Sequence, residues 1–245
     1  MKEVRIFSLV FAVLLSSQVA TADEVILNPI KDNTLFENAT GALSNGAGAY
    51  LFAGNTNGGA TRRGLLVFDV AGNIPAGSVI NSVSLTLNMS KTIAGAQTVE
   101  LRRVLTDWGE GTSDAEGNAG NEGSGAASTA GDASWLHTFF DSATWAAPGG
   151  DFAAAASASL EVGGLGSYTW ESTPELVTDV QAWYENQESN FGWILLGNEA
   201  GNGTAKRFDS RGNGDASLHP QLQIEYMKMT AVEGQTWGQV KREAK

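Results

Sequence analysis

The chain has no cysteine, only 2 histidines, and only 15 Lys and Arg residues against 27 Asp and Glu residues. Without cysteine it can form no disulfide, no cysteine-ligated zinc site and no thiol nucleophile, so its stability has to come from a hydrophobic core. The formal net charge of −12 argues against nucleic acid as a partner, because phosphate binding requires a basic surface. It still allows one small cationic cleft, since net charge describes the whole molecule and not a site.

A basic and then apolar segment opens the chain. Lys2 and Arg5 precede an apolar stretch from Ile6 to Leu15, and Ala20-Thr21-Ala22 follows as a small-x-small cleavage pattern. We therefore interpret residues 1–22 as a signal peptide and expect a secreted or cell-surface protein. The apolar stretch is shorter than the about 20 residues of a transmembrane helix, and no later segment is long and apolar enough, so we expect no transmembrane segment.

The remaining sequence is typical of an all-β protein. Its 30 glycines and low charge content of 17% suit a domain rich in turns, and residues 23–226 suffice for one such domain. The clearest strand is Val79 to Ser90, where apolar residues alternate with Ser, Thr and Asn, which predicts one buried and one hydroxyl-rich exposed face. Further strands are predicted at 24–28, 34–37, 49–53, 63–70, 98–104, 135–140, 167–170, 191–196, 205–209 and 221–226.

One helix interrupts the strands. Ser172-Thr173-Pro174-Glu175 has the pattern of a capping box with Pro in the first turn, and apolar residues then recur on one helical face as far as Tyr184. We expect the helix to end near Asn186. Because strands dominate on both sides of it, we interpret it as a crossover packed on one end of a jelly-roll-like antiparallel β-sandwich.

Two segments stand apart from the predicted strands. Trp108 to Gly131 is rich in Gly, Ala, Ser and Asn, and a loop of this length in a compact domain is usually functional or disordered. Residues 227–245 follow the last predicted strand and include Thr236-Trp237-Gly238, which we interpret as an exposed tail.

Four segments carry a resemblance to a known family. They are residues 45–54, which begin Asn45-Gly46, residues 62–69, which begin Arg62-Arg63-Gly64, residues 190–196, which begin Asn190-Phe191-Gly192-Trp193, and residues 206–211, Lys206-Arg207-Phe208-Asp209-Ser210-Arg211. Together they resemble the DNRLRE-domain family over residues 24–226. The resemblance implies a jelly-roll-like β-sandwich in exported proteins, some of which are carbohydrate-binding modules of the alginate type. The family's Arg-x-x-Arg-Glu ending is broken here, because Gly212 stands where the acid is expected.

Clustered cations provide a candidate ligand site. A uronate carboxylate is best held by guanidinium groups, and sugar faces stack on aromatic rings. The candidate cations are Arg62, Arg63, Lys206, Arg207 and Arg211, and the candidate stacking platforms are Trp108, Trp145 and Trp170. Arg62 and Arg63 point to opposite faces if their strand alternates, so at most one of them shares a given groove.

The same residues have a structural interpretation. Arg62 and Arg207 could instead form ion pairs with Asp69, Asp209 or other carboxylates at sheet edges. Trp183 and Trp193 lie on an apolar helix face and strand, which favours a place in the core.

Metal binding and catalysis have weaker signals. Asp114, Glu116, Asn213 and Asp215 supply oxygen ligands of the kind Ca²⁺ prefers, which makes Ca²⁺ the candidate cofactor, although their spacing matches no EF-hand. His137 and His219 stand in no Gly-x-Ser-x-Gly or metal-binding pattern, so we expect no enzyme.

Three hypotheses follow in order. The first is a non-catalytic protein that binds an acidic polysaccharide of a cell wall or matrix. The second is a structural protein that self-associates through edge strands or the C-terminal tail. The third is a polysaccharide-degrading enzyme, for which the acids of the chain offer no identifiable pair.

Overall fold

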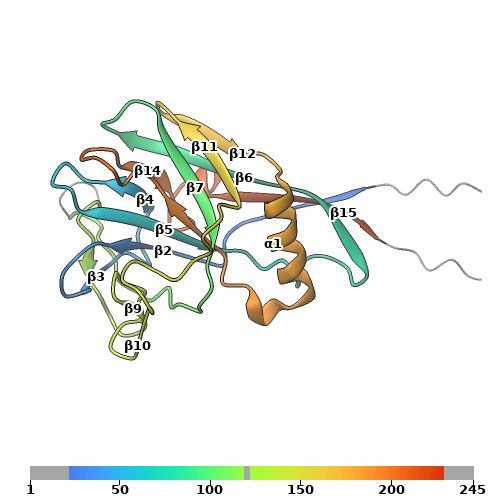
Figure 1. Cartoon of the computed structure of the whole chain (residues 1–245), viewed down its shortest axis with the longest axis horizontal. Helices are drawn as coiled ribbons and strands as arrows, with labels where there is room; N and C mark the ends of the chain where they lie inside the picture. Colours follow the sequence, from blue (N-terminus) through green and yellow to red (C-terminus); the bar gives the residue numbers. More distant parts are fainter. Residues whose placement is uncertain (1–21, 119–121, 229–245) are drawn as a thin grey trace, which may run out of the picture.

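The computed structural model describes residues 22–118 and 122–228. The protein is mostly β, as predicted, and its principal feature is a curled antiparallel sheet of 11 strands that folds over on itself (Figure 1). One half contains β1 (Asp23–Leu27), β15 (Gln221–Lys228), β6 (Ser78–Thr92), β12 (Gly166–Trp170) and β14 (Lys206–Asp209). The other half contains β2 (Lys31–Phe36), β5 (Thr61–Val67), β13 (Trp193–Leu196), β7 (Gln97–Arg103) and β11 (Ala158–Val162). The expected all-β sandwich-like fold is confirmed.

Strand β4 (Tyr50–Asn55) joins the two halves at one corner. Its residues from Tyr50 to Ala53 pair with β14, whereas Gly54 and Asn55 pair with β5. Gly54 has a φ of 103°, which side chains with a Cβ rarely adopt, and this conformation accompanies the change of partner. The corner therefore brings β4, β5 and β14 together, although β5 and β14 are far apart in the sequence.

The main core lies between the two halves. Strand β6 shows the predicted alternation, with Val83, Leu85, Leu87 and Met89 buried and the intervening Ser, Thr and Asn residues half-buried. These apolar residues pack against Leu66, Leu101, Leu195, Phe208, Ile224 and the indoles of Trp170 and Trp193. The period-two pattern thus explains why the hydroxyl-bearing face of β6 points away from the core.

Helix α1 (Pro174–Glu185) closes one end of this core (Figure 1). Leu176, Val180 and Trp183 are buried in the core cluster, and the Trp183 ring meets the Trp193 ring at 4.5 Å between centroids. Thr173 is the N-cap, because its hydroxyl accepts a hydrogen bond from the Leu176 amide. The predicted helix and its crossover position are correct, although the cap is Thr173 and not the start of a Ser172 capping box.

The segment between β7 and β11 covers the outer side of the second half. It carries three short strands, β8 (Ala126–Ala127), β9 (His137–Phe139) and β10 (Ala143–Thr144), with β8 paired to β3 (Leu43–Ser44). Its Trp108, Ala133 and Trp145 pack on Leu35, Leu65, Val67 and Ile194 and form a second core. The expectation of a structureless loop is corrected for the described residues of this segment, because they include short strands and buried side chains. A functional role for the segment stays a prediction.

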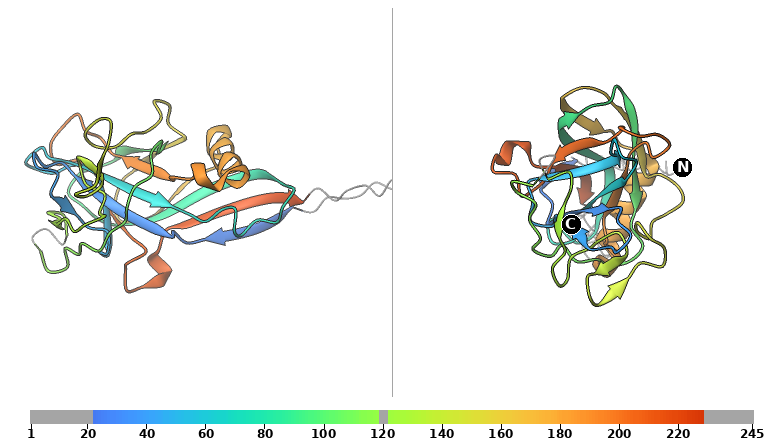
Figure 2. Two further views of the ribbon diagram at one scale, coloured as in Figure 1. Left: turned by 90° about the horizontal axis from the view of Figure 1, so that it is seen from below. Right: turned by 90° about the vertical axis from the view of Figure 1, so that its left-hand side faces the viewer.

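The chain ends of the described part lie together. Strand β1 pairs with β15 from Asp23 opposite Tyr226 to Leu27 opposite Leu222, and Figure 2 shows the two strands side by side at one end of the sandwich. Strand β15 reaches Lys228, two residues into the segment predicted as a tail. The predicted signal peptide, except for Ala22, and residues 229–245 of the predicted tail lie outside the described residues.

Candidate functional site

Two of the predicted ligand-binding cations, Arg63 and Arg211, form ion pairs with carboxylates. Arg63 donates from Nε and Nη2 to the two carboxylate oxygens of Glu199, each at 2.8 Å, and its guanidinium lies over the Trp135 ring. Arg211 pairs with Glu110, and its backbone amide donates to the Asp32 carboxylate at 2.8 Å. These bidentate or linked pairs fix segments of the fold to one another and leave little of either guanidinium for a ligand.

Arg62 and Arg207 form no such pair. The ion-pair interpretation of these two residues is corrected, since no carboxylate of the described residues lies within ion-pair distance of either. Arg62 and Arg63 do point to opposite sides, as the alternation predicted: Arg63 faces the second core, whereas Arg62 lies over the Phe36 ring at 4.8 Å.

A cavity of about 310 Å³ lies at the corner formed by β4, β5 and β14. We call the four cations that line it, Arg62, Lys91, Lys206 and Arg207, the cationic corner. None of the described lining residues is an acid. The other lining residues are Phe52, Thr56, Asn57, Thr92, Ile93, Gly123, Ser124 and Ala205. The cavity therefore combines positive charge with hydroxyl and amide groups and three apolar side chains.

Arg207 is the best-placed cation for a ligand. Its Nε donates to the Ser90 hydroxyl at 3.1 Å, and its Cζ lies 3.6 Å from the centroid of the Tyr50 ring. Only 9% of the residue is exposed, and its buried Nη1 has no hydrogen-bond partner among the described residues. An unsatisfied buried donor on a charged group is costly, and no carboxylate of the described residues offsets the charge, so an anion bound beside Arg207 would be attracted by a guanidinium that the protein leaves unpaired.

Arg62 adds a second guanidinium. Its Nη1 donates to the Thr61 carbonyl at 2.8 Å and its Nε to the Gly123 carbonyl at 3.2 Å. Burial lowers the pKa of Arg62 to about 10, and Glu37 opposes this shift from beyond ion-pair distance. The group thus stays charged at neutral pH without a carboxylate partner.

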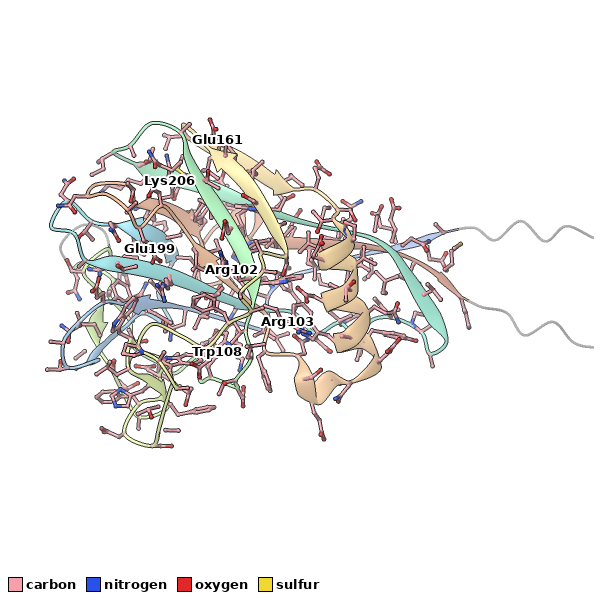
Figure 3. The ribbon with its side chains drawn as sticks, in the orientation of Figure 1. Arg102, Arg103, Trp108, Glu161, Glu199 and Lys206 are labelled. Carbon is pink, nitrogen blue, oxygen red and sulfur yellow. The ribbon has the colours of Figure 1, made fainter. Side chains whose placement is uncertain are left out.

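Lys206 acts at longer range. Its ammonium group is capped by the carbonyls of Gly95 at 2.7 Å and Gly163 at 2.9 Å, and desolvation lowers its pKa. Figure 3 shows it near the end of β14, away from Arg102 and Arg103 at the end of β7. Lys206 therefore contributes positive potential to the corner while its hydrogen bonds tie two loops together.

Sequence reasoning missed Lys91. It ends the alternating part of β6, and the sheet register places it opposite Arg207, beside an irregularity between Arg207 and Phe208. Lys91 is exposed, unlike the other three cations of the corner. A lysine at the end of an alternating strand is a weak signal, and only the pairing of β6 with β14 brings it to the site.

The distribution of ion pairs singles out this corner. Lys31, Arg63, Arg102, Arg103 and Arg211 each pair with a carboxylate. Among the other Lys and Arg residues that the structure describes, only Lys228 lies outside the cationic corner. In a protein of net charge −12, four cations without an acid partner around one cavity indicate a site for an anion.

The three candidate stacking platforms are not available. Trp108, Trp145 and Trp170 have exposed fractions of 0%, 5% and 0%, and each indole NH donates to a backbone carbonyl. The expectation of tryptophan platforms is therefore corrected: all three rings belong to the cores. Trp183 and Trp193 are core residues, as expected. The aromatic rings that lie against the corner's guanidinium groups are those of Tyr50, below Arg207, and Phe36, below Arg62.

The structure brings two of the four candidate calcium ligands to one cavity. Asp114 and Glu116 line a cavity of about 510 Å³, which Gly212 and Gly214 on either side of Asn213 also line, whereas Asp215 caps a short turn by accepting from the Ser217 amide at 3.0 Å. The Asn213 side chain is held by Asp209 and by the Asp215 amide. Within residues 22–118 and 122–228, no group of three or more acids and histidines is arranged to hold a metal ion.

No helix in the described part of the chain is long and apolar enough to cross a membrane. No model of a known protein family matches the sequence, and no curated protein matches it. The resemblance to the DNRLRE-domain family thus stays a prediction.

Proposed function

We propose that this protein is an exported, non-catalytic β-sandwich that binds an acidic polysaccharide at the cationic corner. The observation that carries the proposal is Arg207, a guanidinium with no carboxylate partner and with a buried Nη1 that has no hydrogen bond, which lines a cavity together with three further cations and no described acid. A carboxylate in this cavity would be attracted by the whole group of charges.

The lining suits a uronate better than a simple inorganic anion. Thr56, Asn57, Thr92 and Ser124 offer hydroxyl and amide groups that can exchange hydrogen bonds with sugar hydroxyls, and the exposed Ile93 offers an apolar surface. A cavity of about 310 Å³ is at the lower end of the size range of small-ligand pockets, which fits one sugar unit of a longer chain. The resemblance stated above supports the same ligand class.

Binding of oligogalacturonate and of oligoguluronate, with a neutral glucose oligomer as the comparison, tests the proposal. We expect calorimetry to detect binding of at least one uronate oligomer and none of the glucose oligomer. Arg207→Gln should weaken uronate binding at least about tenfold, because it removes a charge-assisted contact. Arg102→Gln is the matched control, since that guanidinium pairs with Glu100 at 2.7 Å outside the corner.

Two results would overturn the proposal. One is the absence of binding to both uronate oligomers by protein that melts cooperatively. The other is equal loss of binding in Arg207→Gln and Arg102→Gln, which would show that the effect is one of overall charge.

A further inference from the structure

We infer that Asn57 is a site of spontaneous deamidation, and that this reaction places a carboxylate in the cationic corner and weakens its anion binding. The chemical step stands on the structure alone, whereas its effect on binding rests on the proposed function.

The sequence contains four Asn-Gly pairs, which are the pairs most open to this reaction because glycine leaves the following amide unhindered: Asn45-Gly46, Asn57-Gly58, Asn202-Gly203 and Asn213-Gly214. In the reaction, the backbone nitrogen of the glycine attacks the Asn Cγ and a new C–N bond forms. The bond to the side-chain nitrogen breaks, and that nitrogen leaves as ammonia after it takes up the proton that the glycine amide has lost. Water then opens the resulting succinimide to aspartate or isoaspartate.

Two of the four side chains are held in place. Asn45 is buried, and its amide donates to Glu122 at 2.7 Å and accepts from the Ala115 backbone at 2.9 Å. Asn213 donates to Asp209 at 3.1 Å and accepts from the Asp215 backbone at 2.9 Å. Rotation of either Cγ toward the next amide requires these hydrogen bonds to break.

A third pair is blocked at the nucleophile. The backbone nitrogen of Gly203 donates to the Thr56 carbonyl at 2.9 Å, so it is engaged in the β4–β5 turn contact. An amide nitrogen whose proton is committed to a carbonyl is a poor attacking group until that contact opens.

Asn57 and Gly58 carry none of these restraints. Both are exposed, and neither the Asn57 side chain nor the Gly58 amide has a hydrogen-bond partner among the described residues. The surrounding charge also helps, because Asn57 lines the same cavity as Arg62, Lys91 and Arg207. Cations stabilise the deprotonated amide and the oxyanion through which the attack proceeds.

The product would change the electrostatics of the site. Deamidation replaces a neutral amide with a carboxylate in a cavity whose described lining residues include no acid. That carboxylate competes with a ligand anion for Arg62, Lys91 and Arg207, and it repels the ligand itself. We expect the affinity for a uronate oligomer to fall about tenfold, as for other like-charge contacts in a binding site.

Peptide mapping by mass spectrometry of the full protein, incubated at mildly alkaline pH, tests the chemical step. We expect the peptide with Asn57 to convert first, while those with Asn45, Asn202 and Asn213 stay unchanged over the same period. Gly58→Ala should slow the conversion, and it should fold normally, because an added Cβ meets nothing closer than the Thr56 hydroxyl at 3.9 Å. Conversion of another pair before Asn57, or equal rates at all four, would overturn the inference.

Substitution of Asn57 tests the predicted effect of deamidation on anion binding. Asn57→Asp should weaken oligogalacturonate binding about tenfold, whereas Asn57→Gln should keep it within about twofold, since both side chains are neutral amides. If fresh protein binds the uronate and Asn57→Asp binds equally well, the effect on binding is disproved. If fresh protein binds no uronate but Asn57 still converts first, the proposed function fails and the assignment of the reactive residue stands.

Discussion

The cationic corner and the second core use the same kinds of residue in opposite ways. Around the second core, Arg63 meets Glu199, Lys31 meets Asp107, and the rings of Trp108 and Trp135 lie against these cations. At the corner, Arg62 and Arg207 also lie over aromatic rings, but no acid of the described chain pairs with them. Arg62 and Arg63 are neighbours in the sequence and belong to different regions.

This difference shows that pairing, and not the presence of arginine, distinguishes a structural cation from one available to a ligand. A paired guanidinium has its donors and its charge already satisfied, so a ligand would have to displace the carboxylate. An unpaired guanidinium is already partly desolvated by burial, so binding of an anion stabilises it. The following predictions test the distinction, from the largest effect to the smallest.

Removal of the main anchor of the second core should be the most damaging change. We expect Trp108→Ala to lower the free energy of unfolding by about 3–5 kcal/mol, because the indole is fully buried and hydrogen-bonded to the Phe191 carbonyl. Denaturant titration measures this, with Trp135→Ala, a half-buried ring, as the milder control. A loss below about 1 kcal/mol would show that the covering segment is not part of the stable fold.

The buried Asp32 near the paired Arg211 should give the protein a pH-dependent stability. Desolvation raises the pKa of Asp32 to about 7, so the folded protein holds this proton more tightly than the unfolded chain does. Below the unfolded pKa of 3.8, ionisation of Asp32 does not change the free energy of unfolding. As the pH rises toward 7, it lowers the free energy of unfolding by a growing amount, because the unfolded chain releases the proton more readily.

Asp32→Asn should remove that penalty. We expect the variant to exceed the wild type by roughly 2–4 kcal/mol in unfolding free energy at pH above 7, with the difference vanishing near pH 4. The asparagine oxygen can still accept from the Arg211 amide. Thermal melts across this pH range provide the measurement, and a difference that does not depend on pH would contradict the assigned cause.

A carboxylate introduced at the cationic corner should form ion pairs with its unpaired cations, as the carboxylates around the second core do. We expect Ser124→Glu to weaken binding of a uronate oligomer by about 1–3 kcal/mol, since the new acid occupies the unpaired cations. Ser124 is exposed, so the fold should tolerate the change. Ser124→Gln, of nearly the same size but neutral, should bind almost normally in the same calorimetric assay, and an equal loss in both variants would point to steric obstruction.

The exposed cation of the corner should matter least. Lys91→Gln is expected to weaken uronate binding by about 0.2–1 kcal/mol, because solvent screens an exposed charge. Lys228→Gln is the matched control, since Lys228 is the other exposed lysine without an ion pair among residues 22–118 and 122–228 and lies at the end of β15. If the two substitutions reduce the affinity equally, Lys91 acts only through net charge.

The sequence predicts the fold better than the site. Period-two alternation located β6 and predicted its buried face, and Thr173-Pro174 located the start of α1, because both depend on local spacing. Strand β11 was missed, since it directly follows the Ala-rich residues 153–157 and its pairing with β7 bridges the long intervening segment. Pairing between strands that are so distant in the chain produces no recognisable pattern in the sequence of either strand.

The site could not be predicted from the sequence, because its residues are brought together by contacts between segments that are distant in the chain. Trp108 and Trp145 stand in a Gly-rich and Ala-rich context typical of exposed loops, and only the apolar outer side of β2, β5 and β13 explains their burial. The ion-pair partners Glu199 and Glu110 are distant in the sequence from Arg63 and Arg211. Which arginine stays unpaired could therefore be seen only after the strands were in register.

The pairing of β1 with β15 determines from which end the protein can be attached to a support. Strand β1 and the end of β15, where the described chain begins and ends, lie at one end of the sandwich, whereas β4 and β14 lie toward the other end (Figure 1). A support joined to either end would meet the protein at the pole remote from Arg207. Immobilisation of residues 22–228 through a tag placed directly after Lys228 should thus leave the corner facing the solution, while coupling through surface lysines would risk blocking it at Lys91.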